Sequence, residues 1–446
     1  MVANMQGQTG PAKAGQQTLQ GRTLYIPPMA YAGARLVAAG FRSLGIDATI
    51  TPDSDAETLE LGGLHTSGEE CLPHKITIGD FLKICRQPGF DPAKTAFMMC
   101  TAQGPCRFGQ YAPYLRKLLD EQGLSDVMVF SPSSGDGYEG YGLPAGALAH
   151  TMWLAVLAGD LTLRFLLKTR PYEQTAGDSD EAFHRTIRDF EEVLEHGQPK
   201  PKQRRAAMAT AVERMRDRFR NIPARYTKDR PLIGLVGEIF CRLNTFSNDD
   251  IARRVEKFGG ECWISDVGEW VWYVNAYVKS KIVREPGWFK PALLQHKIKT
   301  TIQRNHEHAL LAPVAQDLVG YEEPHDIREV LEAAEPYLPQ RGCIGEMILN
   351  TGKTIYLHGK GADGIIDISP FTCMNGVVCE GIYPAISESH DGLPIRTCYF
   401  DGANTNIDRD LEIFLDLARA YQKRKKIPRI YPDYFDNATL EKPTHA

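Results

Sequence analysis

Residues 232–264 read LIGLVGEIFCRLNTFSNDDIARRVEKFGGECWI and contain a strand, a helix and a second strand in succession. The apolar run from Leu232 to Val236 is typical of a strand that is buried on both faces. Residues 248–258 carry apolar side chains at helical spacing, and residues 261–264 resume a strand after two glycines. Strands that alternate with helices predict a parallel sheet that is covered by helices on both faces.

The same alternation occurs on both sides of this segment. Strands are expected at 23–26, 48–50, 96–99, 127–130, 364–368 and 395–400, and helices at 31–43, 110–121 and 407–426. We therefore predict an α/β protein with two Rossmann-like or flavodoxin-like lobes, whose parallel sheets carry helical insertions and face a central cleft. The expected parts are a disordered tail (1–20), an N-terminal α/β lobe (21–144), a helical connector (145–230) and a C-terminal α/β lobe (231–446) with a helical insertion at about 274–340.

The composition is that of a globular protein with a sizeable core, since 43% of the 446 residues are hydrophobic and 24% are charged. A net charge of −5 gives no general electrostatic reason to expect nucleic-acid or membrane binding. The longest apolar stretch, 143–159, is shorter than the roughly 20 residues of a membrane span. The first residues lack the apolar core of a signal peptide, so we expect a cytoplasmic protein. The basic residues 200–220 form either a solvated helical face or a docking surface for an acidic partner or anionic substrate.

Ten cysteines are the first indication of chemistry, because grouped cysteines in a reducing compartment are more often ligands or redox groups than disulfides. Cys100 and Cys106 follow one predicted strand, and Cys373 and Cys379 follow another with the same spacing. The carboxyl edge of a parallel sheet is where such folds build their sites. Cys71 lies in a loop just before a predicted helix, whose N-terminus favours a thiolate.

These cysteines suit an iron–sulfur cluster, which is held by thiolates, better than a structural zinc site, which usually has tighter spacing. The spacing by itself leaves a metal site and ordinary packing open. Cys85, Cys262 and Cys398 are expected in the core, whereas Cys241 and Cys343 stay ambiguous.

The segment from Gly345 to Thr354 resembles a phosphate-binding loop but has six residues between its glycines, where that motif needs four. It is expected to be an apolar helix, and we predict no ATP site in this chain. His74, His306 and His308 are candidates for proton transfer. His74 is the best of them because it is three residues from Cys71.

Several blocks resemble, in the same order, the C-terminal half of the large CoA-substrate-specific enzyme activases, which is related to the D component of 2-hydroxyglutaryl-CoA dehydratase. The blocks are GEECLPHKITIGDFL (68–82), GPCRFGQYAPYLRKLL (104–119), IGLVGEIFCRLNTFSNDDIARRVEKFGGECW (233–263), GADGIIDISPFTCMNGVVCEGI (361–382) and YFDGANTNIDRDLEIF (399–414). The resemblance covers most of the chain between about residues 61 and 421. It implies an oxygen-sensitive iron–sulfur protein related to 2-hydroxyacyl-CoA dehydratases and double-cubane cluster reductases.

The resemblance also implies a partner and a ligand set. In the wider family an ATP-hydrolysing activator with an actin-like fold delivers low-potential electrons; the chain lacks that ATPase half, so the activator is expected in trans. The family blocks map best onto Cys71, Cys106 and Cys373, with Cys100 or Cys379 completing a 4Fe–4S or double-cubane site. An acyl-CoA or another small molecule that is hard to reduce is the expected substrate, and a homodimer is possible.

Two alternatives stay open: a scaffold or maturation factor that binds a cluster or an activase without turnover, and a zinc-stabilised structural protein. Asp401 and Asn404 are candidates for ligand contact, although a turn followed by a helix cap is the more ordinary interpretation. Glu69 and Glu70 are expected to be loop charges.

Overall fold

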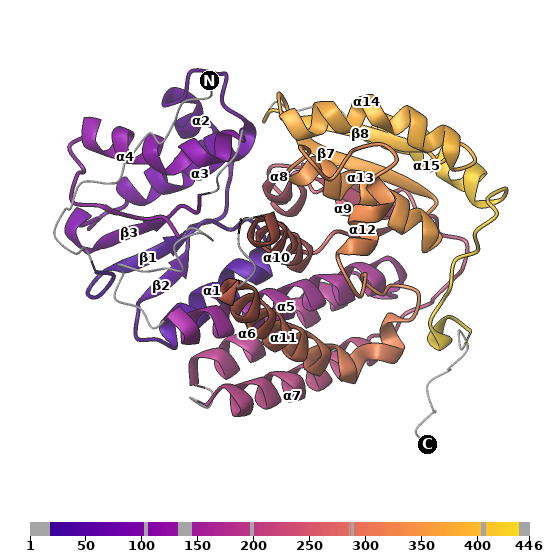
Figure 1. The fold of residues 1–446 in the computed structure, drawn as a ribbon, viewed down its shortest axis with the longest axis horizontal. Helices are drawn as coiled ribbons and strands as arrows, with labels where there is room; N and C mark the ends of the chain where they lie inside the picture. Colours follow the sequence, from indigo (N-terminus) through magenta and orange to yellow (C-terminus); the bar gives the residue numbers. More distant parts are fainter. Residues whose placement is uncertain are drawn as a thin grey trace.

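The chain forms two four-stranded sheets in which every pairing of neighbouring strands is parallel. The computed structural model describes residues 18–101, 106–132, 145–196, 200–284, 286, 290–402 and 407–436. The strand order is β2-β1-β3-β4 in the N-terminal sheet and β6-β5-β7-β8 in the C-terminal sheet (Figure 1). Both sheets therefore have the flavodoxin-like order second, first, third, fourth. The predicted α/β class with two Rossmann-like or flavodoxin-like lobes is confirmed.

In the N-terminal lobe, helices cover both faces of the sheet. Its strands are β1 (Thr23–Ile26), β2 (Ala48–Ile50), β3 (Thr95–Met98) and β4 (Met128–Phe130). Helices α1 (Tyr31–Arg42) and α5 (Ala145–Thr169) pack on one face, and α3 (Leu72–Cys85) and α4 (Tyr111–Glu121) pack on the other. Helix α2 (Ala56–Leu64) lies so close to α3 that a Cβ atom on Gly79 would come within 1.9 Å of the Thr58 carbonyl oxygen. Short 3₁₀ turns precede β3 and α4 at Pro92–Lys94 (η1) and Arg107–Gln110 (η2).

The C-terminal lobe repeats this arrangement. Its strands are β5 (Leu232–Gly237), β6 (Glu261–Ile264), β7 (Gly364–Pro370) and β8 (Ile395–Phe400). Helices α9 (Ile251–Lys257) and α15 (Asp408–Gln422) cover one face, and α13 (Glu346–Gly359) and α14 (Met374–Ser389) cover the other. The five-residue helix α8 (Ile239–Leu243) follows β5. Gly234 in β5 is needed because a Cβ atom there would lie 2.6 Å from Leu357 of α13.

A helical layer joins the two lobes and contains the largest hydrophobic core. It consists of α5, α6 (Asp178–His196), α7 (Pro201–Arg220), α10 (Val267–Arg284) and α11 (Pro291–Leu311), with 3₁₀ segments at Arg170–Tyr172 (η3) and Ala312–Leu318 (η4). Helix α12 (Arg328–Ala334) packs on α13. The core brings together Leu36 of α1, Phe165 of α5 and Trp263 of β6.

Helix α10 begins at Val267, earlier than the expected 274, for a reason that lies outside its own sequence. The Asp160 carboxylate of α5 accepts hydrogen bonds from the backbone amides of Val267 (3.1 Å) and Gly268 (2.8 Å). It therefore satisfies donors that the first turn of a helix leaves unpaired. Helix α15 ends at Gln422, before the basic run that was expected to form its last turn.

The C-terminal segment packs on the helical layer, and its Arg429 pairs with the buried carboxylate of Glu261. Glu261, the first residue of β6, is fully buried. It accepts hydrogen bonds from the Tyr172 hydroxyl at 2.5 Å, from the Tyr321 hydroxyl, and from Arg429 at 2.7 and 2.8 Å. The 3₁₀ turn Asp433–Phe435 (η5) follows, and the Tyr434 hydroxyl accepts a hydrogen bond from Lys168 of α5 at 2.9 Å.

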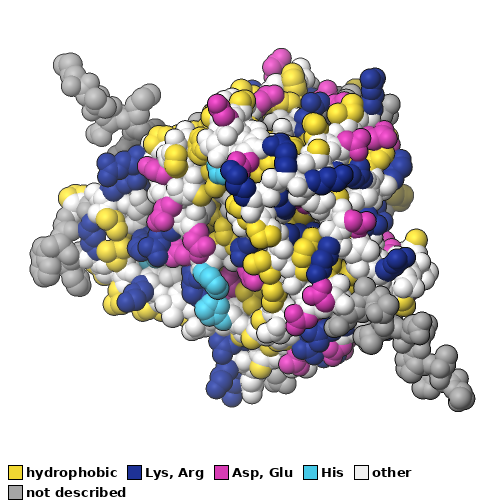
Figure 2. All heavy atoms as spheres, turned by 90° about the vertical axis from the view of Figure 1, so that its right-hand side faces the viewer, with side chains coloured by type: hydrophobic (Ala, Val, Ile, Leu, Met, Phe, Trp, Pro, Cys, Tyr) yellow, Lys and Arg dark blue, Asp and Glu magenta, His cyan; other side chains and the backbone are white. Residues whose placement is uncertain are grey.

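The surface mixes both signs of charge. On the face shown in Figure 2, Lys and Arg side chains alternate with Asp and Glu, and hydrophobic side chains gather in a band between them. Among the described residues, every helix is too short or too polar to span a lipid bilayer.

Candidate cysteine site between the lobes

Three of the predicted cysteines occupy the same local position, the residue just before a helix begins. Cys71 precedes α3, Cys106 precedes η2 and thereby α4, and Cys373 precedes α14. Their backbones share one extended conformation, with φ values of −67°, −66° and −66°. Unpaired amides and the positive end of the helix dipole face this position and favour a thiolate, an effect that burial opposes at all three cysteines.

The structure brings these three cysteines into one electrostatic environment. The charges of Glu238 and Cys106 act on Cys71, and the charges of Glu346 and Glu238 act on both Cys106 and Cys373. Cys106 lies in the N-terminal lobe and Cys373 in the C-terminal lobe, so the group spans both.

Arg107, next to Cys106, links the two lobes directly. Its guanidinium donates to the Glu69 carbonyl oxygen and, at 3.4 Å, to the Thr372 hydroxyl beside Cys373. Thr372 has a φ of 68°, a left-handed conformation that is uncommon for a β-branched residue. The backbone at Cys373 is therefore held in an unusual turn where the lobes meet.

Burial keeps the thiols of this group protonated. Burial raises the pKa of Cys71 to about 11, although a 2.5 Å contact between its Sγ and the Tyr111 hydroxyl lowers that pKa. Burial also raises the pKa values of Cys106 and Cys373, and the nearby Glu346 and Glu238 charges add to the effect. A cation that binds these sulfurs must therefore displace protons from them.

The other two predicted ligands have different local surroundings, since neither stands just before a helix. Cys379 is fully buried in a hydrophobic cluster with Met347 and Tyr383, and its Sγ donates to the Met347 carbonyl oxygen at 3.4 Å. Cys100 lies just after β3 and is half-buried, and the next residues, 102–105, lie outside the described residues. The equal spacing of the two pairs is therefore no structural equivalence, because Cys106 and Cys373 are the two that begin helices.

Two carboxylates beside the cysteines were not found from the sequence. Glu238 precedes α8 and accepts hydrogen bonds from the amides of Phe240 (3.1 Å) and Cys241 (2.7 Å). Glu346 begins α13 and accepts a hydrogen bond from the Ile239 amide at 2.6 Å. Burial, and then the charge of Glu238, raise the pKa of Glu346 to about 8. In the sequence, both carboxylates stand in a Gly-Glu dipeptide. In the structure, the glycine of each dipeptide has a positive φ.

Several buried polar atoms near the group lack a protein partner among the described residues. They include the Asn375 Oδ1 atom, two residues after Cys373, and the His74 Nε2 atom, three residues after Cys71. The Asn375 oxygen can accept a hydrogen bond from a ligand or a water molecule, and the His74 ring nitrogen can donate or accept one. Among the same residues, no three His, Cys, Asp or Glu side chains are arranged to hold a single metal ion.

The remaining sequence candidates have structural surroundings. His74 is buried and stacks on Tyr111 with ring centroids 4.2 Å apart, and burial lowers its pKa to about 4. His306 packs on His150 in the helical layer, and His308 is exposed on α11. Glu70 accepts a hydrogen bond from the Ser67 amide. Asp401 follows β8, and Asn404 lies outside the described residues.

The five other cysteines are mostly core residues. Cys241, Cys262 and Cys398 are buried in one cluster of the C-terminal lobe, and Cys85 and Cys343 are half-buried beside other clusters. The packing predicted for Cys262 and Cys398 is confirmed. Cys241 differs from these two because the charges of Cys373 and Cys71 both act on it, so it borders the cysteine site from inside the C-terminal lobe.

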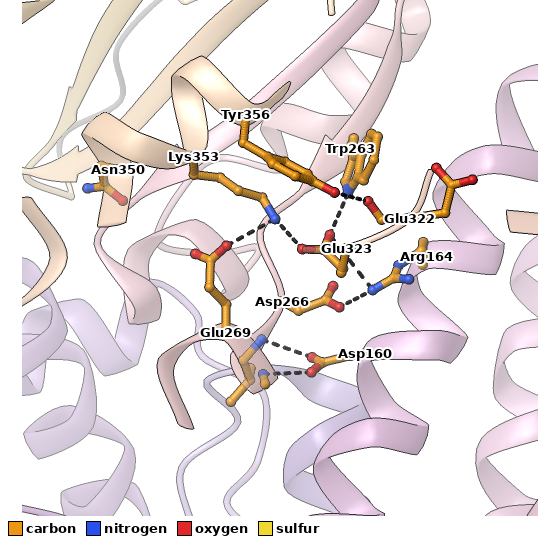
Figure 3. Close-up of polar contacts among 12 residues, drawn as sticks. Asp160, Arg164, Trp263, Asp266, Glu269, Glu322, Glu323, Asn350, Lys353 and Tyr356 are labelled. Carbon is orange, nitrogen blue, oxygen red and sulfur yellow. Dashed lines mark hydrogen bonds and ion pairs between the residues drawn. The ribbon is translucent and has the colours of Figure 1, made fainter. Parts of the chain in front are cut away.

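A second cluster of buried charges lies farther along α13 (Figure 3). Lys353, from the segment that resembles a phosphate-binding loop, is fully buried in this helix and pairs with Glu269 at 3.0 Å and with Glu323. Glu323 also accepts a hydrogen bond from the Trp263 indole at 2.8 Å. The expected apolar helix is thus confirmed at 346–359, and its lysine serves an ion-pair network.

This network joins the helical layer to the C-terminal lobe. Arg164 of α5 pairs with Asp266, which lies between β6 and α10, and Asp160 caps α10 (Figure 3). Four carboxyl groups thus face the two cations Lys353 and Arg164. Burial raises the pKa of Asp160 to about 6 and that of Asp266 well above its usual range, so protons remain in the network at mildly acidic pH.

Comparison of the chain with models of protein families and with curated proteins finds no match.

Proposed function

We propose that this chain is an iron–sulfur protein, related to the 2-hydroxyacyl-CoA dehydratases and their activases, in which Cys71, Cys106 and Cys373 bind iron. The observation that supports it is that three thiols from the two lobes each stand just before a helix and share the charged neighbour Glu238. Three helix N-termini supply positive potential and free amides to a negatively charged cluster. Hydrophobic packing alone does not require three thiols to stand at helix starts.

Three residues around these cysteines, Tyr111, Arg107 and Glu346, have different expected effects on a bound cluster. Tyr111 contacts the Cys71 sulfur, and a hydroxyl donor to a bound thiolate reduces the negative charge on that sulfur. Arg107 contacts the other lobe beside Cys106 and Cys373 through an exposed 3.4 Å hydrogen bond to the Thr372 hydroxyl. Glu346 carries a proton at neutral pH and lies in the electrostatic environment of the same thiols, so it is placed to give a proton to a reduced substrate.

Three protein thiolates leave one iron of a cubane available to substrate, which favours catalysis over simple electron transfer. The cluster, when bound, supplies low-potential electrons, and the proposed partner that charges it is an ATP-hydrolysing activator with an actin-like fold acting in trans. The proposed substrate is an acyl-CoA or another small molecule that is hard to reduce.

The deciding experiment is metal and acid-labile sulfide analysis after strictly anaerobic purification, with an EPR spectrum of the reduced protein. About four irons and four sulfides per chain would establish one cubane, and about eight of each would favour a double cubane and a reductase. Zinc instead of iron, or no metal after attempted reconstitution, would remove the redox proposal. Reoxidation of the reduced protein by an acyl-CoA, measured from its visible absorbance, would then separate a catalyst from an electron carrier.

A further inference from the structure

The arginines of the basic segment 200–220 are of two kinds. Four of them pair with carboxylates, namely Arg214, Arg216, Arg218 and Arg220. Arg204 and Arg205, near the start of α7, form no ion pair with another described residue. Arg204 is nevertheless only 7% exposed. A buried guanidinium normally has a carboxylate or a ligand as its partner, because removing its charge from water is costly.

Two histidines lie beside Arg204 where the helices α5, α7 and α11 pack on one another (Figure 1). The rings of His150 from α5 and His306 from α11 have their centroids 4.3 Å apart, and the charge of Arg204 acts on His150. Arg204 donates a hydrogen bond to the Thr151 hydroxyl at 2.6 Å. The His150 ring donates to the carbonyl oxygen of Pro201, the first residue of α7. These contacts bring the guanidinium and both rings into one cluster.

Each member of this cluster has a buried polar atom that lacks a partner. The three atoms are Nε of Arg204, Nε2 of His150 and Nδ1 of His306, which is only 5% exposed. The charges that act on the two histidines are those of Arg204, Arg205 and His150, and none of the described carboxylates acts on any of the three side chains. Burial, and then the charges of His150 and Arg205, lower the pKa of His306 to about 4. The cluster therefore combines positive potential with free hydrogen-bonding atoms.

The free atoms define the chemistry of a ligand. The Arg204 Nε atom can only donate a hydrogen bond, whereas a neutral imidazole nitrogen can accept one. A phosphate group satisfies both, because its oxygens accept and one of them carries a proton part of the time at neutral pH, its second pKa being about 6. A carboxylate has no proton to donate. The positive end of the α7 dipole adds to the attraction for an anion. We infer that His150, Arg204 and His306 bind phosphate, either free or as the phosphate group of a small molecule.

This site is separate from the cysteine site. Met152, next to Thr151 in α5, packs on Gly40 near the end of α1, where a Cβ atom on the glycine would lie 2.9 Å from the methionine side chain. Helix α1 ends at the amino edge of the N-terminal sheet, since β2 begins after it, whereas Cys106 follows β3 at the carboxyl edge. The inference therefore does not depend on the proposed iron–sulfur function.

Calorimetric titration of the full chain with sodium phosphate tests the inference. At pH 7 and constant ionic strength, the wild type should bind one phosphate per chain. Arg204→Met and His306→Phe should each raise the dissociation constant at least about tenfold, because each removes a hydrogen-bonding atom from the cluster. Phosphate should also raise the thermal unfolding temperature of the wild type but not that of Arg204→Met. Without phosphate, Arg204→Met should be at least as stable as the wild type, since it removes a buried charge that has no partner.

Two control variants make the result specific. Arg214→Met removes a paired arginine from the same helix and should bind phosphate as the wild type does. Asp136→Asn/Glu139→Gln removes two carboxylates that precede α5 and lie outside the described residues, and it should leave the affinity unchanged. Phosphate binding that occurs only in this double variant would mean that a carboxylate of the chain occupies the cluster, which overturns the inference.

Two further outcomes would overturn it: a wild type that gives no saturable phosphate binding, and a folded Arg204→Met variant that binds phosphate with the wild-type affinity. Titration with 2-glycerophosphate identifies the source of the phosphate group. Equal affinities for the two probes would indicate recognition of the phosphate alone, and tighter binding of 2-glycerophosphate would indicate a phosphate ester as the ligand.

Discussion

The two lobes have the same strand order but place different chemical groups at corresponding positions. After the third strand, both lobes begin a helix with cysteine: Cys106 follows β3 and Cys373 follows β7. Before the helix that leads into the third strand, the N-terminal lobe has Cys71, whereas the C-terminal lobe has Gly345 and then Glu346. After the first strand, the C-terminal lobe alone contributes a carboxylate, Glu238, to the group.

The two lobes therefore contribute different chemical groups to the cysteine site. The N-terminal lobe supplies two thiols, and the C-terminal lobe supplies one thiol with two buried carboxyl groups. Thiolates are soft ligands for iron, and a carboxyl group that keeps its proton at neutral pH is a proton donor. In the proposed function, the N-terminal lobe would contribute two of the three cluster ligands, and Glu346 of the C-terminal lobe would donate protons beside the cluster.

The largest expected effect tests the equivalence of Cys106 and Cys373. Replacement of either by alanine should abolish iron retention after anaerobic reconstitution, because each removes one of three thiolates. The matched replacements Cys100→Ala and Cys379→Ala, at the other ends of the two equally spaced pairs, should leave the iron content at the wild-type level, and so should Cys262→Ala. Iron and sulfide analysis provides the measurement, and equal iron in all five variants would disprove the ligand assignment.

The next effect concerns the helices α3 and α13, which occupy corresponding positions. Lys353→Met should destabilise the protein by about 3–5 kcal/mol, because it leaves buried Glu269 and Glu323 without their cation. Urea unfolding followed by circular dichroism at pH 7.5 measures the loss. Lys360→Met, just after the end of the same helix, removes a more exposed ion pair with Glu322 and should cost less than about 1 kcal/mol. Equal losses in the two variants would show that the buried network contributes nothing of its own.

Helix α3 buries an acidic side chain instead of a basic one. Because burial raises the pKa of this acid, the stability of the protein should fall as the pH rises. Asp80 is fully buried against the hydroxyls of Thr58 and Ser54, both at 2.9 Å, and burial raises its pKa to about 7. Its contribution to stability is complete below the pKa of an unfolded aspartate, about 4, and is lost as the pH rises through 7.

Asp80→Asn removes this titration. The variant should be more stable than the wild type by about 1–3 kcal/mol at pH 8, with a difference that shrinks toward pH 5. Urea unfolding at five pH values between these limits gives the measurement. A constant difference across the range would mean that Asp80 does not titrate there, and Glu57→Gln, at an exposed position on α2, supplies the control for loss of a surface charge.

The smallest effect concerns a contact that Cys71 has in the N-terminal lobe. Tyr111→Phe removes the hydroxyl that contacts the Cys71 sulfur and should cost about 1 kcal/mol or less, since a hydrogen bond exchanged with water contributes little net stability. Tyr114→Phe, whose hydroxyl donates to the His65 carbonyl oxygen, is the matched control at the next turn of α4. A loss above about 3 kcal/mol for Tyr111→Phe alone would instead indicate that the variant leaves the buried Cys71 sulfur without a partner at full desolvation cost.

The strands and most helices could be predicted because their local pattern and their burial agree. The apolar run at 232–236 and the alternation of strands with helices specify a covered parallel sheet without knowledge of any distant contact. The start of α10 could not be predicted, since the group that caps it, Asp160, lies more than a hundred residues earlier.

The candidate site was predictable only in part. The position of Cys71 before a helix could be predicted because Pro73 marks that helix start. For Cys106 and Cys373 the sequence predicted only a place after a strand, and the structure adds that each precedes a helix. Cys106 and Cys373 each precede a helix although they stand at opposite ends of two equally spaced pairs, which the spacing alone does not show. Glu238 and Glu346 were missed because a carboxyl group becomes distinctive through burial beside another charge, which is a property of the folded chain.

The buried carboxylate of Glu261 has a consequence for how the protein is made. Its partners Tyr172 and Tyr321 are synthesised before the last strand of the C-terminal sheet, but Arg429 leaves the ribosome only after α15. Until then the carboxylate lacks its cation, and burying it would be costly. The N-terminal lobe is free to fold during synthesis, whereas β6 can be sealed against the helical layer only near the end of translation. Synthesis from the N-terminus to the C-terminus therefore sets the order in which the two lobes complete their folding.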